Sequence, residues 1–458
     1  MNKKNQEQIK SNRKMKKSNY NVFFSKNKCV LSYNTFTDNY VIVSHKAHEI
    51  FENEDLDIFK NICPSVFDSF RQSGFIINDE MDELGAIRLA NRRQTFANRN
   101  YFLMIYPTQD CNLKCWYCYE THVKNTCISK DVMNATVKHI ANKIERKEID
   151  SLHLTFFGGE PLLFFDATVY PLLKQVNELC SKAGISFYPF FVTNGSLITE
   201  DVVLKLKPFN PLFQITLDGN KQKHDKVRIG KTDNYPTFEK IISALQLISD
   251  NISSENSLVP RIITLRLNYD NQTLKYTDEI IDEISKLDKS KISIHLERVW
   301  QTKNSVNKEQ VDELKQTIVK FLKAGFRVGH GIFGLRHVSC PAEVYNYAVI
   351  NYNGLVYRCN GRNLTPNTAE GKLLPDGRIE WNEVDLIKRL SRQTFENDKC
   401  LKCVMLPQCM GPCSQKQIEK GWGNIDDICS LNVIDTSLED YLTLDFEVRY
   451  SLGNSNKL

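Results

Sequence analysis

Three cysteines stand close together in one short run of the chain. The run YPTQDCNLKCWYCYE places Cys111, Cys115 and Cys118 in C-x3-C-x2-C spacing, directly after a segment that is predicted to be a strand. Three thiolates on one tight loop can hold three irons of a cubane iron–sulfur cluster and leave the fourth iron without a protein ligand. Such an open iron can chelate a small molecule, into which the cluster can pass an electron. A zinc site is the alternative, and it needs a fourth ligand nearby.

Glycines and polar residues gather at the ends of the next predicted strands. LTFFGGEP carries Gly158, Gly159 and Glu160, FVTNG carries Asn194 and Gly195, and QITLDG carries Asp218 and Gly219, with His224, Asp225 and Arg228 shortly after. Paired glycines let the backbone approach a ligand closely because no Cβ intrudes. The Glu160 carboxylate can accept hydrogen bonds from an ammonium group. Each feature alone is typical of a turn, but together they predict a ligand pocket.

A second group of seven cysteines occupies the last third of the chain: Cys340, Cys359, Cys400, Cys403, Cys409, Cys413 and Cys429. The dipeptide Asn353-Gly354, between alternating apolar residues, predicts a hairpin between the first two cysteines. C-x2-C pairs also bind zinc, but seven cysteines do not divide into four-cysteine zinc sites. The remaining cysteines are scattered, and we predict that they are small buried hydrophobic residues: Cys29, Cys63, Cys127 and Cys180.

Composition and charge narrow the class of protein. The 458 residues include 14 cysteines, and contents of 41% hydrophobic and 25% charged residues are those of an ordinary globular protein. No apolar run is long enough to span a membrane, and the basic N-terminus lacks the apolar stretch of a secretory signal. We therefore expect a cytoplasmic protein without membrane contact, where clustered cysteines indicate metal or redox chemistry. The net charge of +5 is concentrated in residues 1–17, so the body carries no signature of nucleic-acid binding.

Residues 101–330 alternate strand-like and helix-like segments that must position the first cysteine group. The predicted strands are 101–108, 152–157, 186–193, 212–217, 262–268 and 292–299, with amphipathic helices such as 131–146 and 308–323 between them. Six β/α units with nearly continuous apolar strands predict a parallel sheet covered by helices. The predicted fold class is α/β, a partial (β/α)6 TIM-like barrel, in which reactive groups gather at the C-terminal strand ends.

Other segments flank this core, which we place at residues 98–330. Residues 1–19 are predicted to be a basic disordered tail. Residues 20–97 are predicted to be a small α/β unit of three short strands followed by helices. Residues 331–440 form a predicted cysteine-rich domain, and residues 441–458 a C-terminal tail.

The segment from Cys111 to Arg228 resembles the core domain of radical S-adenosylmethionine (radical SAM) enzymes. The resemblance implies that the first three cysteines hold a catalytic 4Fe–4S cluster, whose open iron binds the amino and carboxylate groups of S-adenosylmethionine (SAM). It assigns SAM contacts to Tyr117, Gly158, Gly159, Glu160, Asn194, Thr216 and Arg228. In this family one electron cleaves SAM to methionine and a 5′-deoxyadenosyl radical, which abstracts hydrogen from an inert C–H bond.

The seven C-terminal cysteines resemble the SPASM extension found behind radical SAM cores. The resemblance implies two auxiliary clusters, and therefore three 4Fe–4S clusters in the chain. One auxiliary cluster is assigned to Cys400, Cys403, Cys409 and Cys429, and the other to Cys340, Cys359 and Cys413, which leaves it one ligand short. In sulfatase-maturing relatives a cysteine at the position of Gly334 completes this second cluster. Here its iron stays open or another residue, such as His337, fills the position, and both alternatives stand.

Enzymes of this group mostly act on peptides or proteins. The unit at 20–97 is similar to the winged-helix module with which maturases of ribosomally made peptides (RiPPs) capture a leader peptide as an added strand. A plain cap on the barrel is the alternative. Asn360 stands where sulfatase-maturing enzymes carry an aspartate that is thought to take a proton from the substrate, and an amide cannot act as that base.

The resemblance therefore favours a maturase that forms a thioether, a carbon–carbon cross-link or an epimerised residue in a precursor peptide. Two alternatives remain. One is an anaerobic sulfatase maturase that forms formylglycine, with which the run at 214–228 is shared. The other is a non-catalytic zinc-binding protein. The enzyme interpretation also implies a low-potential electron donor of the flavodoxin or ferredoxin type.

Overall fold

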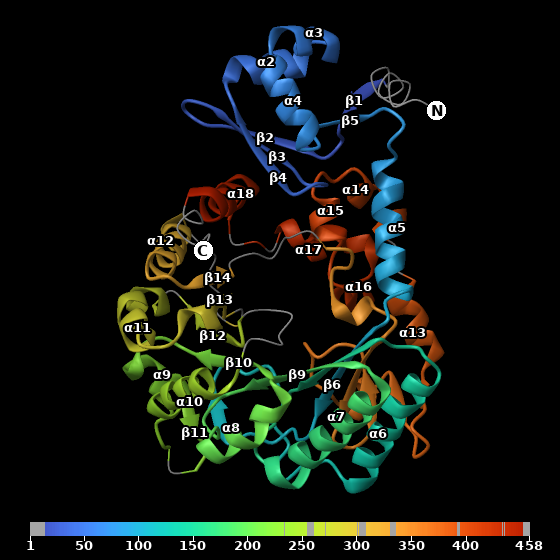
Figure 1. Cartoon of the computed structure of the whole chain (residues 1–458), viewed down its shortest axis with the longest axis vertical. Helices are drawn as coiled ribbons and strands as arrows, with labels where there is room; N and C mark the ends of the chain where they lie inside the picture. The colour runs from blue at the N-terminus through green and yellow to red at the C-terminus, as the bar shows by residue number, and fades with distance from the viewer. Residues whose placement is uncertain are drawn as a thin grey trace. The chain divides into compact units, whose positions relative to one another are not determined.

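The computed structural model of the chain divides into two compact units (Figure 1). Unit 1 comprises residues 1–97, 331–343 and 391–451, and unit 2 comprises residues 98–330, 344–390 and 452–458. The structure describes residues 14–232, 234–253, 261–270, 272–299, 301, 308–329, 336–391, 394–432, 434 and 436–451. The first part of the predicted tail and Gly334 lie outside these residues. Each unit is described by itself.

A large, mostly parallel sheet forms the centre of unit 2. Its order is β14-β13-β12-β10-β9-β8-β6-β15-β16-β17-β18. The parallel strands are β6 (Asn100–Tyr106), β8 (Ser151–Phe156), β9 (Ser186–Thr193), β10 (Leu212–Leu217), β12 (Ile263–Tyr269), β13 (Ile292–Arg298), β14 (Arg327–Gly329) and β15 (Tyr347–Asn351). The six predicted strands and the α/β partial barrel are confirmed.

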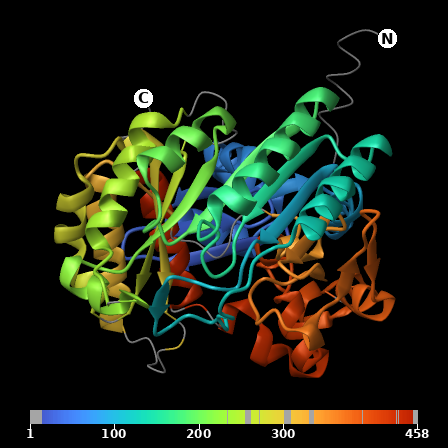
Figure 2. The same cartoon turned by 90° about the horizontal axis from the view of Figure 1, so that it is seen from below.

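Helices connect these strands and cover the outer side of the sheet (Figure 2). They are α6 (Lys130–Glu145), the π-helix η1 (Phe165–Val169) with α7 (Tyr170–Ala183), α8 (Glu200–Leu206), α9 (Lys221–Val227), α10 (Phe238–Asn251), α11 (Thr277–Ile284) and α12 (Lys308–Lys323). The side chains of Ser129, Thr199 and Asn220 cap α6, α8 and α9 by accepting from backbone amides. The capped helices α8 and α9 begin within a few residues of the strands before them, whereas α6 begins after the long loop that follows β6.

Residues 344–390 extend the same sheet. β15 pairs in parallel with β6, and a turn at Asn353-Gly354, with Gly354 at φ 79°, leads into β16 (Leu355–Tyr357). This is the predicted hairpin. β17 (Gly371–Leu373), β18 (Ile379–Trp381) and α13 (Glu383–Leu390) follow. The part of the predicted cysteine-rich domain that carries Cys359 is therefore built onto the core sheet of unit 2.

The N-terminal part of unit 1 has the predicted order of strands followed by helices. The three-stranded sheet consists of β2 (Asn21–Ser25), β3 (Val30–Asn34) and β4 (Asn39–Val43). The helices are α2 (His45–Asn53), α3 (Leu56–Ile62), α4 (Pro64–Gln72) and α5 (Glu83–Phe96). Five buried phenylalanines form the core between sheet and helices: Phe51, Phe59, Phe67, Phe70 and Phe75. This aromatic core fixes the helices on one face of the sheet.

Two segments of unit 1 differ from the predicted tails. Residues Met15–Lys17 form strand β1, which pairs antiparallel with β5 (Ile76–Asn78), because β5 offers an edge with free backbone groups. At the other end of the chain, α18 (Leu438–Phe446) and the π-helix η10 (Glu447–Ser451) form part of the folded unit. The hydroxyl of Tyr40 donates to Asp445 at 2.8 Å, and α18 packs on the face of the sheet opposite the helices α2 to α4.

Most of the cysteines of unit 1 lie on or close to a set of short helices. These helices are α14 (Asp398–Leu401), α15 (Leu406–Cys409), α16 (Ser414–Lys420) and α17 (Ile425–Ile428). Single 3-10 turns lie around them at η5 (Pro341–Glu343), η7 (Thr394–Glu396), η8 (Trp422–Asn424) and η9 (Ser430–Asn432). Among the helices in the described ranges, none has the length and apolar character that a membrane span requires.

Candidate active site

The three cysteines of the first group lie on the loop between β6 and α6. Leu113–Cys115 form the short strand β7, which pairs antiparallel with β11 (Arg228–Gly230), so that Cys115 lies opposite Arg228. The amide of Cys118 donates to the carbonyl of Cys115 at 3.2 Å and closes a tight turn. One short segment therefore presents all three thiols, and β11 holds that segment in place.

The sulfur of Cys111 has the most enclosed environment of the three. Cys111 is 7% exposed, and its Sγ accepts from the amide of Leu113 at 3.4 Å. The side-chain amide of Asn194 lies 3.9 Å from the same sulfur. Burial raises the pKa of Cys111 to about 12. A thiol of this kind is protonated at neutral pH unless a metal ion replaces its proton, which is the chemistry of a metal ligand rather than of a free nucleophile.

The two glycines after β8 allow close packing against this loop. The amide of Gly159 donates to the carbonyl of Thr108, and the amide of Glu160 donates to the carbonyl of Asp110 at 2.9 Å. A Cβ on Gly158 or Gly159 would collide with the backbone of residues 108–110, and Gly158 has φ 110°. The close approach that the glycines permit is therefore to the loop that leads into Cys111.

The carboxylate of Glu160 is fully buried, and it holds the C-terminal end of the neighbouring strand β9 in place. It accepts from the amides of Leu162 and Asn194 at 3.0 and 2.8 Å and from the hydroxyl of Thr193 at 2.7 Å. Burial raises its pKa, and these donors oppose that rise. With three donors on two oxygens, the carboxylate retains acceptor capacity for one further N–H group.

Asn194 connects the end of β9 to the cysteine loop. Its side-chain amide donates to Oδ1 of Asn112 at 2.8 Å, and its own Oδ1 accepts from the hydroxyl of Ser196 at 2.6 Å. Asn112 in turn donates to Ser196 at 2.9 Å and to the hydroxyl of Tyr235 at 2.8 Å. The predicted residue Asn194 thus lies beside Cys111 within a closed set of amide and hydroxyl groups.

Tyr117 and Arg228 meet in a buried network at the ends of β10 and β12. The Tyr117 hydroxyl donates to Asp218 at 2.5 Å and accepts from Arg228 at 2.7 Å and from Asn268 at 2.9 Å. The Arg228 guanidinium also pairs with Asp218 at 3.4 Å. Burial raises the pKa of Asp218, and Arg228 opposes that rise. Within the described part of the chain, Asp218 Oδ1 and Arg228 Nε have no hydrogen-bond partner, so the network can still receive a polar ligand.

The sequence patterns pointed to several of the residues at these C-terminal strand ends, but not to all of them. Thr216 lies on β10 in register with Arg266 of β12, one residue before the strand ends, and is half-buried. Asn268 and Asn112 were not assigned to the site, although Asn268 stands near the end of its strand just as Asn194 and Asp218 follow theirs. Applied to the run RLNYD, the strand-end rule would have found Asn268. Glu120 directly follows the cysteine loop and was also missed.

Comparison with known proteins identifies this arrangement. Residues 105–260 match the family model described as the radical SAM superfamily, and that range includes the cysteine loop and the strand ends β8 to β10. The chain contains a radical SAM domain. The chain is therefore an enzyme, and the matched family implies SAM and a 4Fe–4S cluster as its cofactors.

Relatives of the radical SAM domain extend beyond the matched segment. The radical SAM cyclopropyl synthase TigE of Paramaledivibacter caminithermalis is 22% identical, over 84% of this chain and 84% of that protein. A cysteine-type anaerobic sulfatase-maturating enzyme of Clostridium perfringens is 24% identical, over 78% of this chain and 99% of that protein. Among solved structures, native anSMEcpe with bound AdoMet and Cp18Cys peptide has a TM-score of 0.55 and 18% identity, over 78% of this chain and 100% of that chain. The shared fold is therefore that of radical SAM enzymes.

The side chains of the radical SAM domain fit the cluster and SAM that the family implies. Three cysteines on one loop offer soft thiolate donors, which suit iron–sulfur clusters. Among the described residues no His, Cys, Asp and Glu side chains converge on a single metal ion. A cubane places each thiolate on a different iron, so its ligands stand further apart than those of one ion. The unpartnered atoms of Asp218 and Arg228 supply one buried acceptor and one buried donor next to this loop.

In unit 1, the structure brings several cysteines of the second group together. The amide of Cys403 donates to the carbonyl of Cys400 at 3.1 Å. Burial raises the pKa of Cys403, and the nearby thiols of Cys409 and Cys429 raise it further. Cys340 and Cys413 also belong to unit 1, where Cys413 is the residue before α16. The four cysteines that the SPASM resemblance assigns to one cluster thus lie in the same short-helix segment.

Cys359 belongs to unit 2 and lies near the first cysteine loop. The hydroxyl of Tyr119, the residue after Cys118, donates to the carbonyl of Asn360 at 3.1 Å. The thiol of Cys359 contributes to the raised pKa of Tyr119, after burial and other acidic neighbours. The loops that carry Cys118 and Cys359 are therefore in direct contact within unit 2.

Proposed function

We propose that this chain is a radical SAM peptide maturase that modifies a ribosomally made peptide by C–H abstraction. The observation that carries the proposal is the cysteine loop of the radical SAM domain in contact with the loop of Cys359. The two most extensive relatives reported above are a cyclopropyl synthase and a sulfatase-maturating enzyme, and the second acts on a protein by its name. A cyclopropyl ring closes by forming a carbon–carbon bond, so we place a carbon–carbon link first among the products, ahead of a thioether or an epimerised residue.

The residues of the radical SAM domain divide the work of binding. Cys111, Cys115 and Cys118 would hold the cluster, and bound SAM would supply a 5′-deoxyadenosyl radical as the hydrogen acceptor. Tyr117, Asp218 and Arg228 hold one another in place, so the guanidinium is fixed before a ligand arrives and can bind a carboxylate. The remaining acceptor capacity of Glu160 suits an ammonium group. Gly158, Gly159, Asn194 and Thr216 complete the proposed SAM pocket.

Two auxiliary 4Fe–4S clusters extend the proposal. Cys400, Cys403, Cys409 and Cys429 would ligate one, and Cys340, Cys359 and Cys413 the other. The thiol of Cys429 contributes to the raised pKa values of Cys403 and Cys409, which supports the first set. Whether the second cluster keeps an open iron or uses a residue such as His337 is decided by its spectrum with and without a thiol-containing peptide. A low-potential flavodoxin or ferredoxin in the cytoplasm would supply the electrons.

The three-stranded sheet of unit 1 is the proposed site for the leader of the precursor peptide. Its edge strand β4 lies next to α4, and Ile42 on β4 is 52% exposed. A peptide added to this edge gains backbone hydrogen bonds from the strand and side-chain contacts beside the helix. Replacing Ile42 with Glu should weaken binding of the leader without affecting SAM cleavage in the absence of peptide.

A sulfatase maturase is the second candidate, because two of the relatives reported above are proteins of that kind. Asn360 argues against it, since its amide cannot accept a proton as a carboxylate does. The decisive experiment is anaerobic co-expression with a short peptide encoded beside this gene, followed by mass spectrometry. Loss of two hydrogens supports a cross-link or thioether, and unchanged mass with solvent deuterium uptake supports epimerisation. A formylglycine in a co-expressed sulfatase, with the peptide unmodified, would favour the second candidate.

Metal analysis separates both enzymes from a zinc-binding protein. Three 4Fe–4S clusters correspond to about 12 iron atoms per chain. Anaerobically reconstituted protein should approach that content and convert SAM to methionine and 5′-deoxyadenosine under a strong reductant. Stoichiometric zinc with almost no iron would contradict the proposed function.

A further inference from the structure

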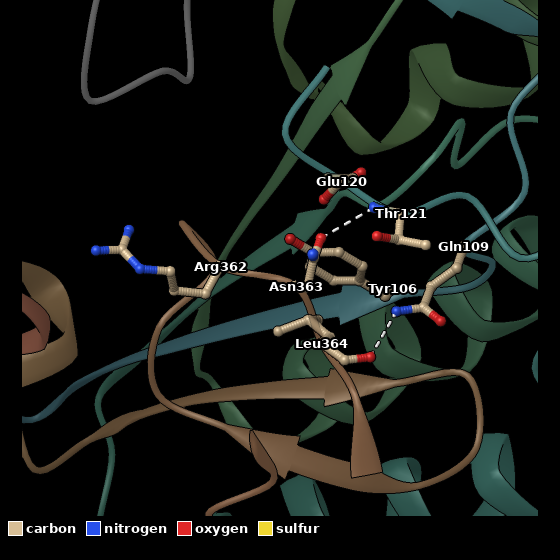
Figure 3. Close-up of a pocket in the computed structure, with 7 residues that line it drawn as sticks. All are labelled: Tyr106, Gln109, Glu120, Thr121, Arg362, Asn363 and Leu364. Atoms are coloured by element: carbon tan, nitrogen blue, oxygen red, sulfur yellow. Dashed lines mark hydrogen bonds between the residues drawn. The ribbon is translucent and has the colours of Figure 1, made fainter. Parts of the chain in front are cut away.

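A small cavity lies in unit 2 beside the cysteine loop (Figure 3). It is lined by Tyr106, Gln109, Glu120, Thr121, Arg362, Asn363 and Leu364. These residues come from the end of β6, from the cysteine loop and from the loop that follows Cys359. The cavity therefore lies between the two cysteine-bearing loops that Tyr119 and Asn360 join.

Glu120 is the chemically exceptional residue of this lining. Its carboxyl group is buried beside Tyr106, whose hydroxyl donates to the carbonyl of Asn360 at 3.5 Å. In the described part of the chain the Oε1 atom of Glu120 has no hydrogen-bond partner. A buried carboxyl oxygen without a donor is unfavourable, because it has lost its water and gained nothing in exchange. The cavity thus offers an acceptor that a ligand can satisfy.

The other polar groups of the cavity are engaged with one another rather than with Glu120. The amide nitrogen of Gln109 donates to the carbonyl of Leu364 at 2.9 Å, and its oxygen points away from Glu120 (Figure 3). Oδ1 of Asn363 accepts from the amide of Thr121 at 3.0 Å. Arg362, the cationic residue of the lining, donates to the carbonyl of Gly361 at 2.8 Å and points away from the other lining side chains (Figure 3). Among the lining residues that the structure describes, none places its cationic group against Glu120 (Figure 3).

We propose that this cavity binds a primary ammonium group of the peptide substrate, with Glu120 as its main acceptor. An ammonium is compact and carries three donors, which suits a small cavity with an unpartnered carboxyl oxygen. The planar guanidinium of arginine needs more room and a bidentate partner. The group can come from a lysine side chain or from the N-terminal amine. The inference rests on the proposed peptide-maturase function and assigns a binding role to a residue beside its cluster loop.

The first test uses n-butylammonium chloride as a mimic of the lysine side chain. Calorimetric titration of the anaerobic holoenzyme should show saturable binding, with 1-butanol as the neutral comparison showing none. Glu120→Gln should weaken n-butylammonium at least about tenfold, the effect of losing about 1.4 kcal/mol. Glu178→Gln, an exposed glutamate of α7, is the matched control and should bind as the wild type does. Equal affinity of wild type and Glu120→Gln, or no saturable binding by the wild type, would overturn the proposal.

Folding of the variant is checked by its iron content and circular dichroism. If Glu120→Gln loses iron, Asn363→Leu provides an independent test, because it keeps the carboxyl and fills the cavity with apolar volume. It should weaken n-butylammonium to a similar degree. Retained affinity in that variant would contradict the assignment of the cavity.

The second test separates the two sources of the ammonium and also tests the proposed function. In a peptide that the enzyme modifies, each lysine is replaced by norleucine, and in a second set the N-terminus is acetylated. The change that removes the bound group should raise KM about tenfold or more in the wild type and have little effect in Glu120→Gln. If n-butylammonium binds through Glu120 but no peptide is modified, the proposed function fails and the site stands. If a peptide is modified and neither change alters KM, the ammonium proposal fails and the function stands.

Discussion

The two cysteine groups are held by different kinds of structure. In unit 2, the loop of Cys111 is attached to a large sheet, and its neighbours Tyr117, Asp218 and Arg228 are bonded to one another. In unit 1, the cysteines between residues 400 and 429 lie on or close to helices of only four to seven residues. Helices this short are marginal without tertiary support. We therefore expect that backbone elements preassemble the first site, whereas the proposed auxiliary clusters would contribute much of the order of the second.

The largest expected effect tests the first half of this comparison. Cys111→Ala removes one thiolate from the first loop, so SAM cleavage should fall by at least about a thousandfold, or about 4 kcal/mol in activation energy. Because the sheet does not depend on this thiol, the variant should keep its secondary structure and lose about four iron atoms. Cys180→Ala, at a buried cysteine of α7, is the control and should keep its iron. The measurements are 5′-deoxyadenosine by chromatography, iron by colorimetry and circular dichroism. Full activity of Cys111→Ala would break the assignment.

The second prediction tests the other half. Removal of iron by an anaerobic chelator should strip hydrogen-exchange protection from residues 398–429, because metal binding to such a segment is coupled to its folding. The strands β6, β8, β9 and β10 should keep most of their protection, since their hydrogen bonds belong to the sheet. Exchange measured by mass spectrometry on holo and metal-free protein makes the comparison. Equal loss in both regions would show that the two sites depend on metal to the same degree.

A smaller, pH-dependent effect distinguishes unit 2 further. His139 of α6 accepts from the Tyr101 hydroxyl and donates to the Gly377 carbonyl, each at 2.7 Å. Burial lowers its pKa from 6.5 to about 4. Between these two pH values the unfolded chain binds more protons than the folded chain. The contribution of neutral His139 to the free energy of unfolding is therefore fully present above pH 6.5. It is lost as the pH falls from 6.5 towards 4, by roughly 3 kcal/mol.

His139→Gln should remove that pH dependence, and His45→Gln, on the exposed start of α2, should retain it. The measurement is urea unfolding at pH 5 and pH 7.5, followed by hydrogen exchange in α6. An unchanged difference in unfolding free energy between the two pH values in His139→Gln would contradict the role of this histidine.

The smallest expected effect concerns preassembly of the SAM site. Asp218→Asn keeps the shape of the side chain but removes the charge that holds Arg228, so KM for SAM should rise about tenfold, or about 1.4 kcal/mol. The value of kcat should change less, because the cluster ligands are untouched. Asp288→Asn, at an exposed turn, is the control. A fall in kcat with KM unchanged would mean that Asp218 does not act by positioning Arg228.

Sequence patterns predicted the regular parts of the molecule because those parts repeat. Apolar strands at even spacing identified β6, β8, β9, β10, β12 and β13, and cysteine spacing identified the loop of Cys111. Strand β1 was not predicted, because Met15–Lys17 is a basic, polar run that becomes a strand only by pairing with the edge of β5. Helix α18 was not predicted for a similar reason. Its burial depends on a sheet about 400 residues earlier in the chain, for example through the hydrogen bond between Tyr40 and Asp445. Asn268 could have been found from its place near a strand end, whereas nothing in the sequence indicates that the Glu120 carboxyl group is buried without a donor on its Oε1 atom.

The parallel pairing of β15 with β6 limits where the protein can be truncated. A gene fragment that stops before residue 344 removes β15 and leaves β6 as an open edge in the middle of the natural sheet. Unpaired edges of this length recruit strands from other molecules. Such a truncated protein should precipitate or form aggregates on expression, so the catalytic core and the strands that follow it must be produced as one piece.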